Sequence, residues 1–321
     1  MMLLDFRDAA FSAVHKIMAA DENVIILYND FGAQGLDRIK TDYPHRVINI
    51  GIAEQNLISV AAGLALAGKK IVIYSIAAHV TTRCYEQVKL DVCAMGLPVI
   101  ILGMGSGLSY GVDGPTHQAT ADIAIMRALP GMTIYNPSDA ISAQAIVQLA
   151  YESGIPTYIR LDKDQHDAVY SKSQNFSDGL HLFDSGGSIT LVTTGMMVHR
   201  AIAAKKELAG EKIVINVVDL YRIKPCNEQI LKNIIANSQH IVTLEEHSSI
   251  GGIGTIVAEI LVTMDRKVTF SRLSLRDEMC FGSESRNWAH ERYGLSLDAL
   301  LQALKNVFFT VTNPSDETTL R

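Results

Sequence analysis

Hydrophobic and polar residues follow two alternating periods along the first half of this chain. Short runs of consecutive apolar, mostly β-branched residues are typical of buried strands. Between these runs, apolar residues recur every three to four positions, as on one face of a helix. Strands that alternate with helices in this way predict a parallel, doubly wound α/β sheet. The predicted strands are 24–28, 47–50, 71–74, 97–102, 132–135 and 156–160, and the predicted helices are 8–20, 52–67, 81–95, 119–128 and 139–153.

The pattern stops and then starts again, which indicates two domains. Residues 163–187 are rich in Asp, Lys, Ser, Gln and Gly, as linkers are. We therefore predict a first domain over 1–165, a linker over 166–187, a second domain over 188–310 and a frayed polar tail over 311–321. In the second domain the predicted strands are 189–193, 213–218, 240–244 and 267–272, and the predicted helices are 197–208, 227–236 and 253–263.

Composition and charge exclude several classes of protein. With 48% hydrophobic and 19% charged residues, the chain has the composition of a packed enzyme and not of a disordered segment. The net charge of −6 gives no electrostatic basis for binding nucleic acid or an anionic membrane. The sequence has no apolar run long enough to span a bilayer, and the acidic and basic residues within 1–7 lead us to expect no secretory leader. Its four cysteines lack metal-site spacing, so we expect free thiols in the cytoplasm.

The segment Gly51–Asn56 joins a predicted strand to a predicted helix and carries one acidic residue. Residues 47–50 are expected to form a buried strand, which places Glu54 at the start of the next helix among apolar neighbours such as Ile52 and Ile58. A carboxyl group removed from water holds its proton more tightly, which suits proton transfer. The alternative is an ordinary first-turn glutamate that complements the helix dipole.

Two short motifs resemble the signatures of a known enzyme group. Gly51–Asn56 (Gly-Ile-Ala-Glu-Gln-Asn) resembles the pyrimidine-domain signature of the thiamine diphosphate enzymes of the transketolase and deoxyxylulose-phosphate synthase group. Gly111–Gln118 (Gly-Val-Asp-Gly-Pro-Thr-His-Gln) resembles a second transketolase signature, in the same order and at the same spacing. The segments Asp219–Pro225, Glu245–Gly254 and Tyr293–Leu295 are similar to the transketolase C-terminal domain. The resemblance implies two doubly wound domains, one that binds the pyrimidine of thiamine diphosphate and one of the C-terminal type.

The resemblance also implies roles for individual residues. In this group the motif glutamate, here Glu54, hydrogen-bonds N1′ of the aminopyrimidine and thereby promotes deprotonation of thiazolium C2. The histidine and the aspartate of the second signature, here His117 and Asp113, are implicated in proton transfer and in contact with a sugar hydroxyl. Arg160 matches an arginine that grips the substrate phosphate, and Arg7 matches a second such arginine near the start of the domain.

The first departure from the family pattern concerns the coenzyme ring. Transketolases stack an aromatic side chain on the aminopyrimidine, but residues 75–83 contain no phenylalanine. We expect Ile52 to contact the ring and one of Tyr74, His79 and Tyr85 to replace the missing aromatic group, unless cofactor affinity is low.

Two further departures concern the substrate and the diphosphate. An additional substrate histidine of transketolases falls on Gly105 or a neighbour, which predicts altered recognition of phosphosugars. The family's Gly-Asp-Gly followed by Asn-Asn, which binds Mg²⁺ and the diphosphate, is not in the 321 residues. The resemblance therefore implies a thiamine diphosphate site shared with a separate diphosphate-binding subunit that holds the Mg²⁺, no metal ligand on this chain, and a two-fold α2β2 assembly.

The predicted activity is transfer of a two-carbon ketol unit between phosphorylated sugars. One alternative is a ketoacid-using subunit similar to deoxyxylulose-phosphate synthase or to the β-subunit of a 2-oxo-acid dehydrogenase, although the intact motif 113–117 favours a sugar transferase over the dehydrogenase. Another is a non-catalytic regulatory homologue. A nicotinamide enzyme is a weak alternative, because the glycine-rich loop 103–111 lacks the G-x-G-x-x-G spacing.

Overall fold

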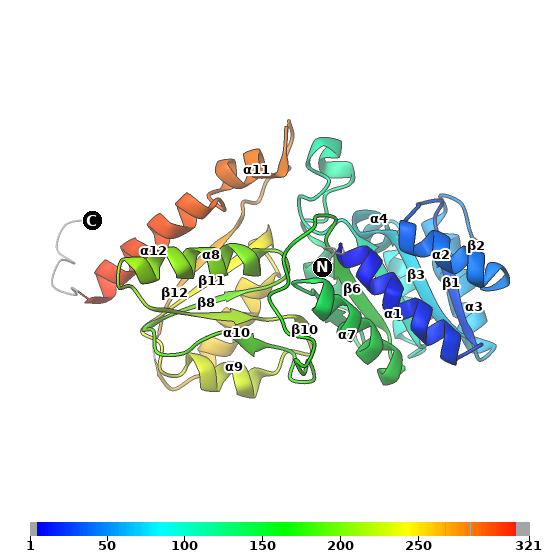
Figure 1. Ribbon diagram of the computed structural model, residues 1–321, viewed down its shortest axis with the longest axis horizontal. Coiled ribbons are helices and arrows are strands. Elements are labelled where there is room, and N and C mark those ends of the chain that lie inside the picture. The colour runs from blue at the N-terminus through cyan, green and yellow to red at the C-terminus, as the bar shows by residue number, and fades with distance from the viewer. Residues whose placement is uncertain (1–4, 267, 283, 313–321) are drawn as a thin grey trace.

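The computed structural model describes residues 5–266, 268–282 and 284–312, which form two α/β domains side by side (Figure 1). The strands of the first half are β1 (Val24–Tyr28), β2 (Val47–Asn49), β3 (Lys70–Ile76), β4 (Val99–Met104), β5 (Thr133–Tyr135) and β6 (Thr157–Leu161). Its helical segments are α1 (Phe6–Ala20), α2 (Gln34–Asp42), η1 (Pro44–Arg46), α3 (Glu54–Leu66), α4 (Ala77–Thr82), α5 (Tyr85–Gln87), η2 (Val88–Cys93), η3 (Gly111–Thr116), α6 (Asp122–Arg127) and α7 (Ala140–Ser153).

The second half of the chain repeats the alternation of strands and helices. Its strands are β7 (His181–Leu182), β8 (Ile189–Thr193), β9 (Ile215–Asp219), β10 (Arg222–Lys224), β11 (His240–Ser248) and β12 (Thr269–Leu275). Its helices are α8 (Met197–Gly210), α9 (Glu228–Ile235), α10 (Ile253–Val262), α11 (Arg286–Tyr293) and α12 (Leu297–Thr312). None of the helices in the described part of the chain has the length and apolar character needed to cross a bilayer.

Both sheets are mainly parallel, so the predicted α/β fold class is confirmed. The first has the strand order β10-β5-β6-β4-β3-β1-β2, and the second has the order β12-β11-β8-β9-β7. In each sheet one edge strand, β10 or β7, runs antiparallel to its neighbour. Parallel strands have their carboxyl ends at the same side of the sheet, where ligands of open α/β folds usually bind.

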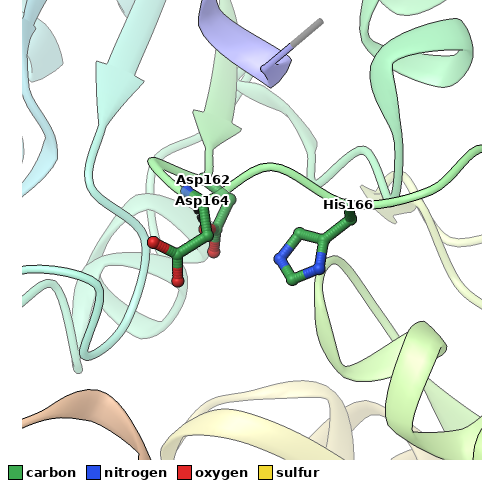
Figure 2. A group of neighbouring side chains, drawn as sticks. All are labelled: Asp162, Asp164 and His166. Atoms are coloured by element: carbon green, nitrogen blue, oxygen red, sulfur yellow. Dashed lines mark hydrogen bonds between the residues drawn. The ribbon is translucent and has the colours of Figure 1, made fainter. Parts of the chain in front are cut away.

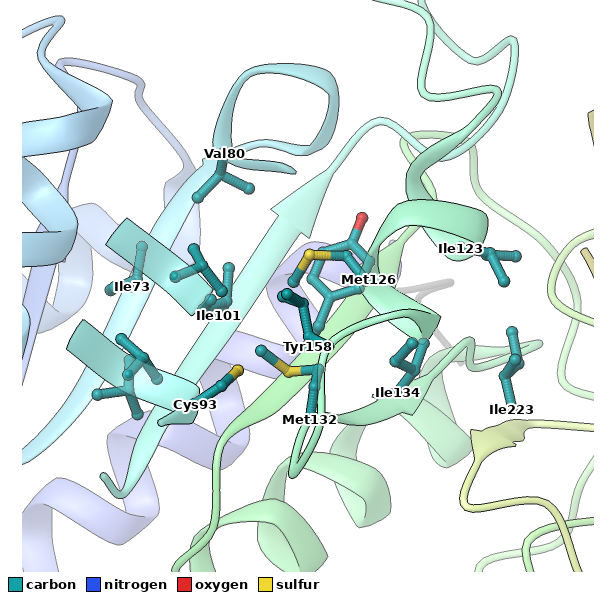
Figure 3. Packing of buried hydrophobic residues seen from close by; sticks show 14 of the residues in the cluster. Ile73, Val80, Cys93, Ile101, Ile123, Met126, Met132, Ile134, Tyr158 and Ile223 are labelled. Atoms are coloured by element: carbon teal, nitrogen blue, oxygen red, sulfur yellow. The ribbon is translucent and has the colours of Figure 1, made fainter. Parts of the chain in front are cut away.

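The first sheet is buried on both faces because side chains alternate along its strands. On one face, Ile73 of β3, Ile101 of β4 and Tyr158 of β6 pack against Cys93 and Met126 (Figure 3). On the other face, neighbouring residues of the same strands pack against the apolar sides of α1, α2 and α7. Helix α3 lies on the first of these faces, and this sets which strand residues can approach it.

One strand from the second half of the chain belongs to the first sheet. Strand β10 follows β9 in the chain but pairs antiparallel with β5 of the first sheet. Strand β7 lies within the predicted linker and pairs with β9 at the edge of the second sheet. The segment 166–187 therefore contains one regular strand, and the two domains are joined by a strand as well as by the linker.

Several predicted elements differ from the structure. The strand predicted to be buried at 47–50 is the edge strand β2, in which Ile48 and Asn49 are exposed, because only β1 pairs with it. The helix predicted over 81–95 is divided into α4, α5 and a π-helical segment, η2. Helix α2 was not predicted, because it buries only Leu36 and Ile39. The predicted tail lies outside the described residues from 313 onward.

Candidate active site

The turn before α3 positions Glu54. Gly51 has φ of +76°, a conformation that glycine adopts at little cost, and it lets the chain turn from β2 toward α3. Asn29 donates a hydrogen bond to the Gly51 carbonyl oxygen at 2.7 Å, and the Asn49 side chain accepts one from the Gly51 amide at 2.9 Å. Glu54 is then the first residue of α3 and is only 6% exposed.

The two oxygens of the Glu54 carboxyl group have different surroundings. Oε1 accepts a hydrogen bond from Nη1 of Arg83 at 3.0 Å and lies 3.7 Å from Nδ1 of His79. Among the described residues, Oε2 has no hydrogen-bond partner. Glu54 is thus at the first turn of its helix, as the dipole explanation requires, but its side chain also faces a histidine and keeps one oxygen available to a ligand.

Two histidines extend the site from Glu54. Nε2 of His79 lies 3.1 Å from the Thr116 carbonyl oxygen, so this nitrogen is the donor and Nδ1, toward Glu54, is the acceptor of the neutral ring. Burial, with the charge of Arg83 and the nearness of His117, lowers the pKa of His79, although Glu54 acts in the opposite direction. The His79 and His117 rings meet edge to face, with centroids 4.9 Å apart. Glu54, His79 and His117 therefore form one contiguous group.

A tyrosine beside this group contacts one of the predicted substrate residues. Tyr110 approaches His117 edge to face, with ring centroids 5.9 Å apart. Burial raises the pKa of Tyr110 to about 12, with the charge of Arg7 acting to lower it and that of Asp113 acting to raise it. The Asp113 amide donates a hydrogen bond to the Tyr110 carbonyl oxygen at 3.0 Å, so the structure places Asp113 near His117. Arg7 pairs with Asp5 at 3.2 Å and lies 3.7 Å from Asp8.

Arg160 is not placed as the resemblance implied. Its side chain is buried, Nε donates to Oδ2 of Asp122 at 2.8 Å, and Nη2 donates to the carbonyl oxygens of Ala119 and Glu246 at 2.9 and 3.1 Å. With Nε and Nη2 engaged in this way, the guanidinium group joins parts of the protein. We therefore leave Arg160 out of the proposed substrate site.

The structure brings only some of the residues predicted to contact the coenzyme ring to Glu54. Tyr74 is fully buried between two phenylalanine rings on the face of the sheet opposite α3, so the structure does not bring it to Glu54. The Tyr85 hydroxyl donates to the Ile125 carbonyl oxygen at 3.0 Å. Ile52 is 75% exposed, which corrects the expectation that it encloses Glu54. Of the candidates for the missing aromatic group, His79 is the one that contacts Glu54.

A second charged cluster joins the two domains and was missed by the sequence reasoning. Asp162, Asp164 and His166 lie together at the end of β6 (Figure 2), with potential ligand atoms within 4.8 Å of one another. The Arg286 guanidinium donates to Asp162 at 2.8 and 2.7 Å and to Asp164 at 2.7 Å. A protein cation therefore already neutralises these carboxylates, and we assign no metal to them. The partners are more than 120 positions apart in the sequence, so no local pattern could reveal them.

Both the fold and the site have counterparts among known proteins. Residues 3–167 match the family described as "Transketolase, pyrimidine binding domain", and residues 181–299 match "Transketolase, C-terminal domain". The chain belongs to the transketolase family, which is a family of transferases. Family membership also implies dependence on thiamine diphosphate.

Particular relatives define the type more closely. The chain is 33% identical to one subunit of the apulose-4-phosphate transketolase of Actinobacillus succinogenes, over 81% of its own length and 84% of that protein. It is 33% identical to the 6-deoxy-6-sulfo-D-fructose transketolase subunit SqwH of a Clostridium species over 94% of both chains. A solved split-gene transketolase, described as an inactive beta4 tetramer, superimposes with a TM-score of 0.84 at 30% identity, covering 94% of this chain and 97% of that one. By contrast, this chain covers 48% of the transketolase of Rattus norvegicus, to which it is 29% identical.

The residues around Glu54 fit the pyrimidine ring of thiamine diphosphate. One carboxyl oxygen of Glu54 is open to a ring nitrogen, and His79, 3.7 Å from the other oxygen, offers a flat ring where the sequence lacks phenylalanine. The fit is to the pyrimidine end of the coenzyme.

Proposed function

We propose that this chain is the pyrimidine-binding subunit of a two-chain transketolase. It transfers a two-carbon ketol unit between sugars that carry an anionic group, in a site completed by a separate diphosphate-binding subunit. The observation that carries the proposal is the Glu54 carboxyl group, which is buried at the start of α3 with one oxygen open and His79 at 3.7 Å.

The residues of the site have distinct roles in this proposal. Glu54 shares a proton at Oε2 with the pyrimidine ring, and Arg83 holds its other oxygen in place. His117 exchanges a proton with the substrate, His79 packs between His117 and Glu54, and Asp113 accepts a hydrogen bond from a sugar hydroxyl. The bound coenzyme supplies the carbanion chemistry, and the protein supplies orientation and electrostatics.

Exposed apolar side chains of the first domain support a partner chain. Ile48 of β2, Ile52, Leu90 of η2 and Val112 of η3 are 38%, 75%, 49% and 72% exposed. Ile52 and Val112 belong to the two motif segments, so a partner that completes the site would cover them. In our proposal the partner binds the diphosphate through Mg²⁺, and the complex is an α2β2 heterotetramer in the cytoplasm, where the chain's free cysteines stay reduced.

The names of two relatives indicate the class of substrate that we propose. One is named for apulose 4-phosphate and another for a 6-sulfo sugar, and both of these molecules carry an anionic group on a short carbon skeleton. We extend this chemistry to the present chain. A ketoacid substrate and a purely regulatory role are the alternatives that the following experiment distinguishes.

The test compares Glu54→Gln with the matched control Glu86→Gln, an exposed carboxylate on the nearby helix α5. Each variant is co-purified with the diphosphate-binding partner, and calorimetric binding of thiamine diphosphate with Mg²⁺ and ketol transfer are measured. We expect Glu54→Gln to lose turnover by about 100-fold or more, the range of acid–base contributions, and Glu86→Gln to retain it. Wild-type turnover in Glu54→Gln would refute the assigned role. No coenzyme binding by the wild-type complex would favour the regulatory alternative, and turnover with 2-oxo acids alone would favour the ketoacid enzyme.

A further inference from the structure

The space beside Gly105 is filled by the ring of Tyr110. Gly105 has φ of +91°, and a Cβ atom at this position would lie 2.0 Å from Cε2 of Tyr110 and 2.3 Å from its Cδ2. No L-residue fits there without displacing the ring. The Tyr110 ring therefore occupies the space that a side chain at position 105 would need, such as the additional substrate histidine of the family.

Tyr110 brings a lysine toward the site. Lys163 follows β6 directly, and its Nζ lies 4.8 Å from the centroid of the Tyr110 ring, which is the geometry of a cation–π contact. The Tyr110 ring also contacts His117, with the two ring centroids 5.9 Å apart. A cationic side chain thus lies over a tyrosine that borders the predicted catalytic histidine.

The charge of Lys163 is not neutralised by its neighbours in the sequence. Lys163 stands between two acidic residues, Asp162 and Asp164. Both carboxylates are instead bound by Arg286, at distances of 2.7 and 2.8 Å. Within the described residues Lys163 forms no ion pair, and its side chain is exposed. A flexible ammonium group in this position is free to meet an anion.

We propose that Lys163, held over Tyr110, binds the terminal anionic group of the sugar substrate. The inference rests on the proposed transketolase function and names the residue that selects anionic sugars at that site. It also fits the predicted alteration of phosphosugar recognition, because Arg160 is buried and position 105 has no side chain. A tetrahedral oxyanion, whether a phosphate ester or a sulfonate, is the chemistry that this ammonium group recognises.

The experiment uses the complex with its partner and the matched acceptors ribose and ribose 5-phosphate. We expect Lys163→Gln to raise KM for ribose 5-phosphate by about tenfold, the effect of one lost hydrogen bond to a charged group, and to leave kcat with that acceptor and kcat/KM for ribose unchanged. Lys163→Arg should restore most of the affinity. Lys206→Gln, which removes an exposed lysine of α8, is the control and should behave as wild type. An unchanged KM for ribose 5-phosphate, or an equal loss with both acceptors, would overturn the inference.

A binding measurement separates this inference from the proposed function. Wild-type and Lys163→Gln chains are titrated calorimetrically with inorganic phosphate and with methanesulfonate. Weaker binding of either anion by the variant supports the lysine site, even if the wild-type complex turns over neither acceptor and the proposed function fails. Binding that is equal in both proteins, or absent from both, counts against the lysine site whatever the turnover. The stronger of the two ligands indicates whether phosphate or sulfonate sugars are preferred.

Discussion

Replacing Arg286 with methionine removes one guanidinium group from among three carboxylates. In the wild-type protein Nη1 and Nη2 donate to Asp162 at 2.8 and 2.7 Å, Nη1 donates to Asp164 at 2.7 Å, and Nε donates to Glu246 at 2.8 Å. Asp162 and Glu246 are only 2% and 4% exposed. Methionine retains much of the apolar stem of arginine, so the main effect is two buried carboxylates that lose their cation.

The expected cost can be estimated from these contacts. Removing one partner of a buried ion pair costs about 3–5 kcal/mol. Because Glu246 keeps its contact with His290 at 2.5 Å and Asp162 keeps that with Ser106 at 2.7 Å, we expect the lower end, about 3 kcal/mol of unfolding free energy.

The cost should depend on pH in a defined direction. Burial alone would raise the pKa values of Asp162 and Glu246, but Arg286 outweighs it and lowers both. A carboxyl group with a lowered pKa stabilises the fold above its unfolded value, which is near 4, and that stability is lost as the pH falls through the folded value. Without Arg286 this contribution disappears. The deficit of Arg286→Met should therefore be largest near pH 8 and should shrink toward pH 4, where the freed carboxyl groups can take up protons.

Chemical unfolding at pH 8 and pH 5, followed by circular dichroism, tests this reasoning. The single tryptophan, Trp288, lies on α11 with Arg286, so its fluorescence reports on the same region. Arg292→Met on the same helix is the matched control, because the Arg292–Glu278 pair is exposed and 3.5 Å apart and should change stability by less than about 1 kcal/mol. The reasoning is refuted if Arg286→Met is as stable as Arg292→Met at pH 8, or if its deficit is the same at both pH values.

Two further substitutions test other parts of the structure. Burial raises the pKa of Asp219 to about 7 despite hydrogen bonds from Ser138 and Tyr170, so its contribution to stability is present below pH 4 and lost as the pH rises through 7. The free energy of unfolding of Asp219→Asn should therefore exceed that of wild type by about 1–4 kcal/mol between pH 5 and pH 8, as measured by thermal unfolding. A difference that does not change with pH would contradict the assignment. Gly105→Ala should destabilise the protein by more than about 1 kcal/mol and weaken ribose 5-phosphate binding, because it displaces Tyr110. Gly96→Ala, with φ of +61° and open space around it, measures the backbone strain alone, and equal effects of the two substitutions would argue against ring displacement.

The sequence predicted those features that depend on neighbouring residues. The alternation of apolar runs and helical periods predicted the α/β class, and the first motif placed Glu54 at the start of its helix. Edge positions could not be predicted, because the exposure of Ile52 depends on which strands pair in space. Arg83 was missed because its contact with Glu54 spans 29 positions, and the burial of Arg160 depends on Asp122, 38 positions away. Such contacts arise only when distant segments are brought together by the fold.

Strand β10 also has a consequence for how the chain can be divided. It supplies the outermost strand beyond β5, although it lies after the start of the second domain. A polypeptide shortened at residue 187 would retain every helix of the first half but would leave the backbone of β5 unpaired and open to self-association. In the intact chain β10 covers that side of β5 and is itself the edge strand. The strand at the opposite edge of this sheet is β2, directly next to the turn that leads to Glu54.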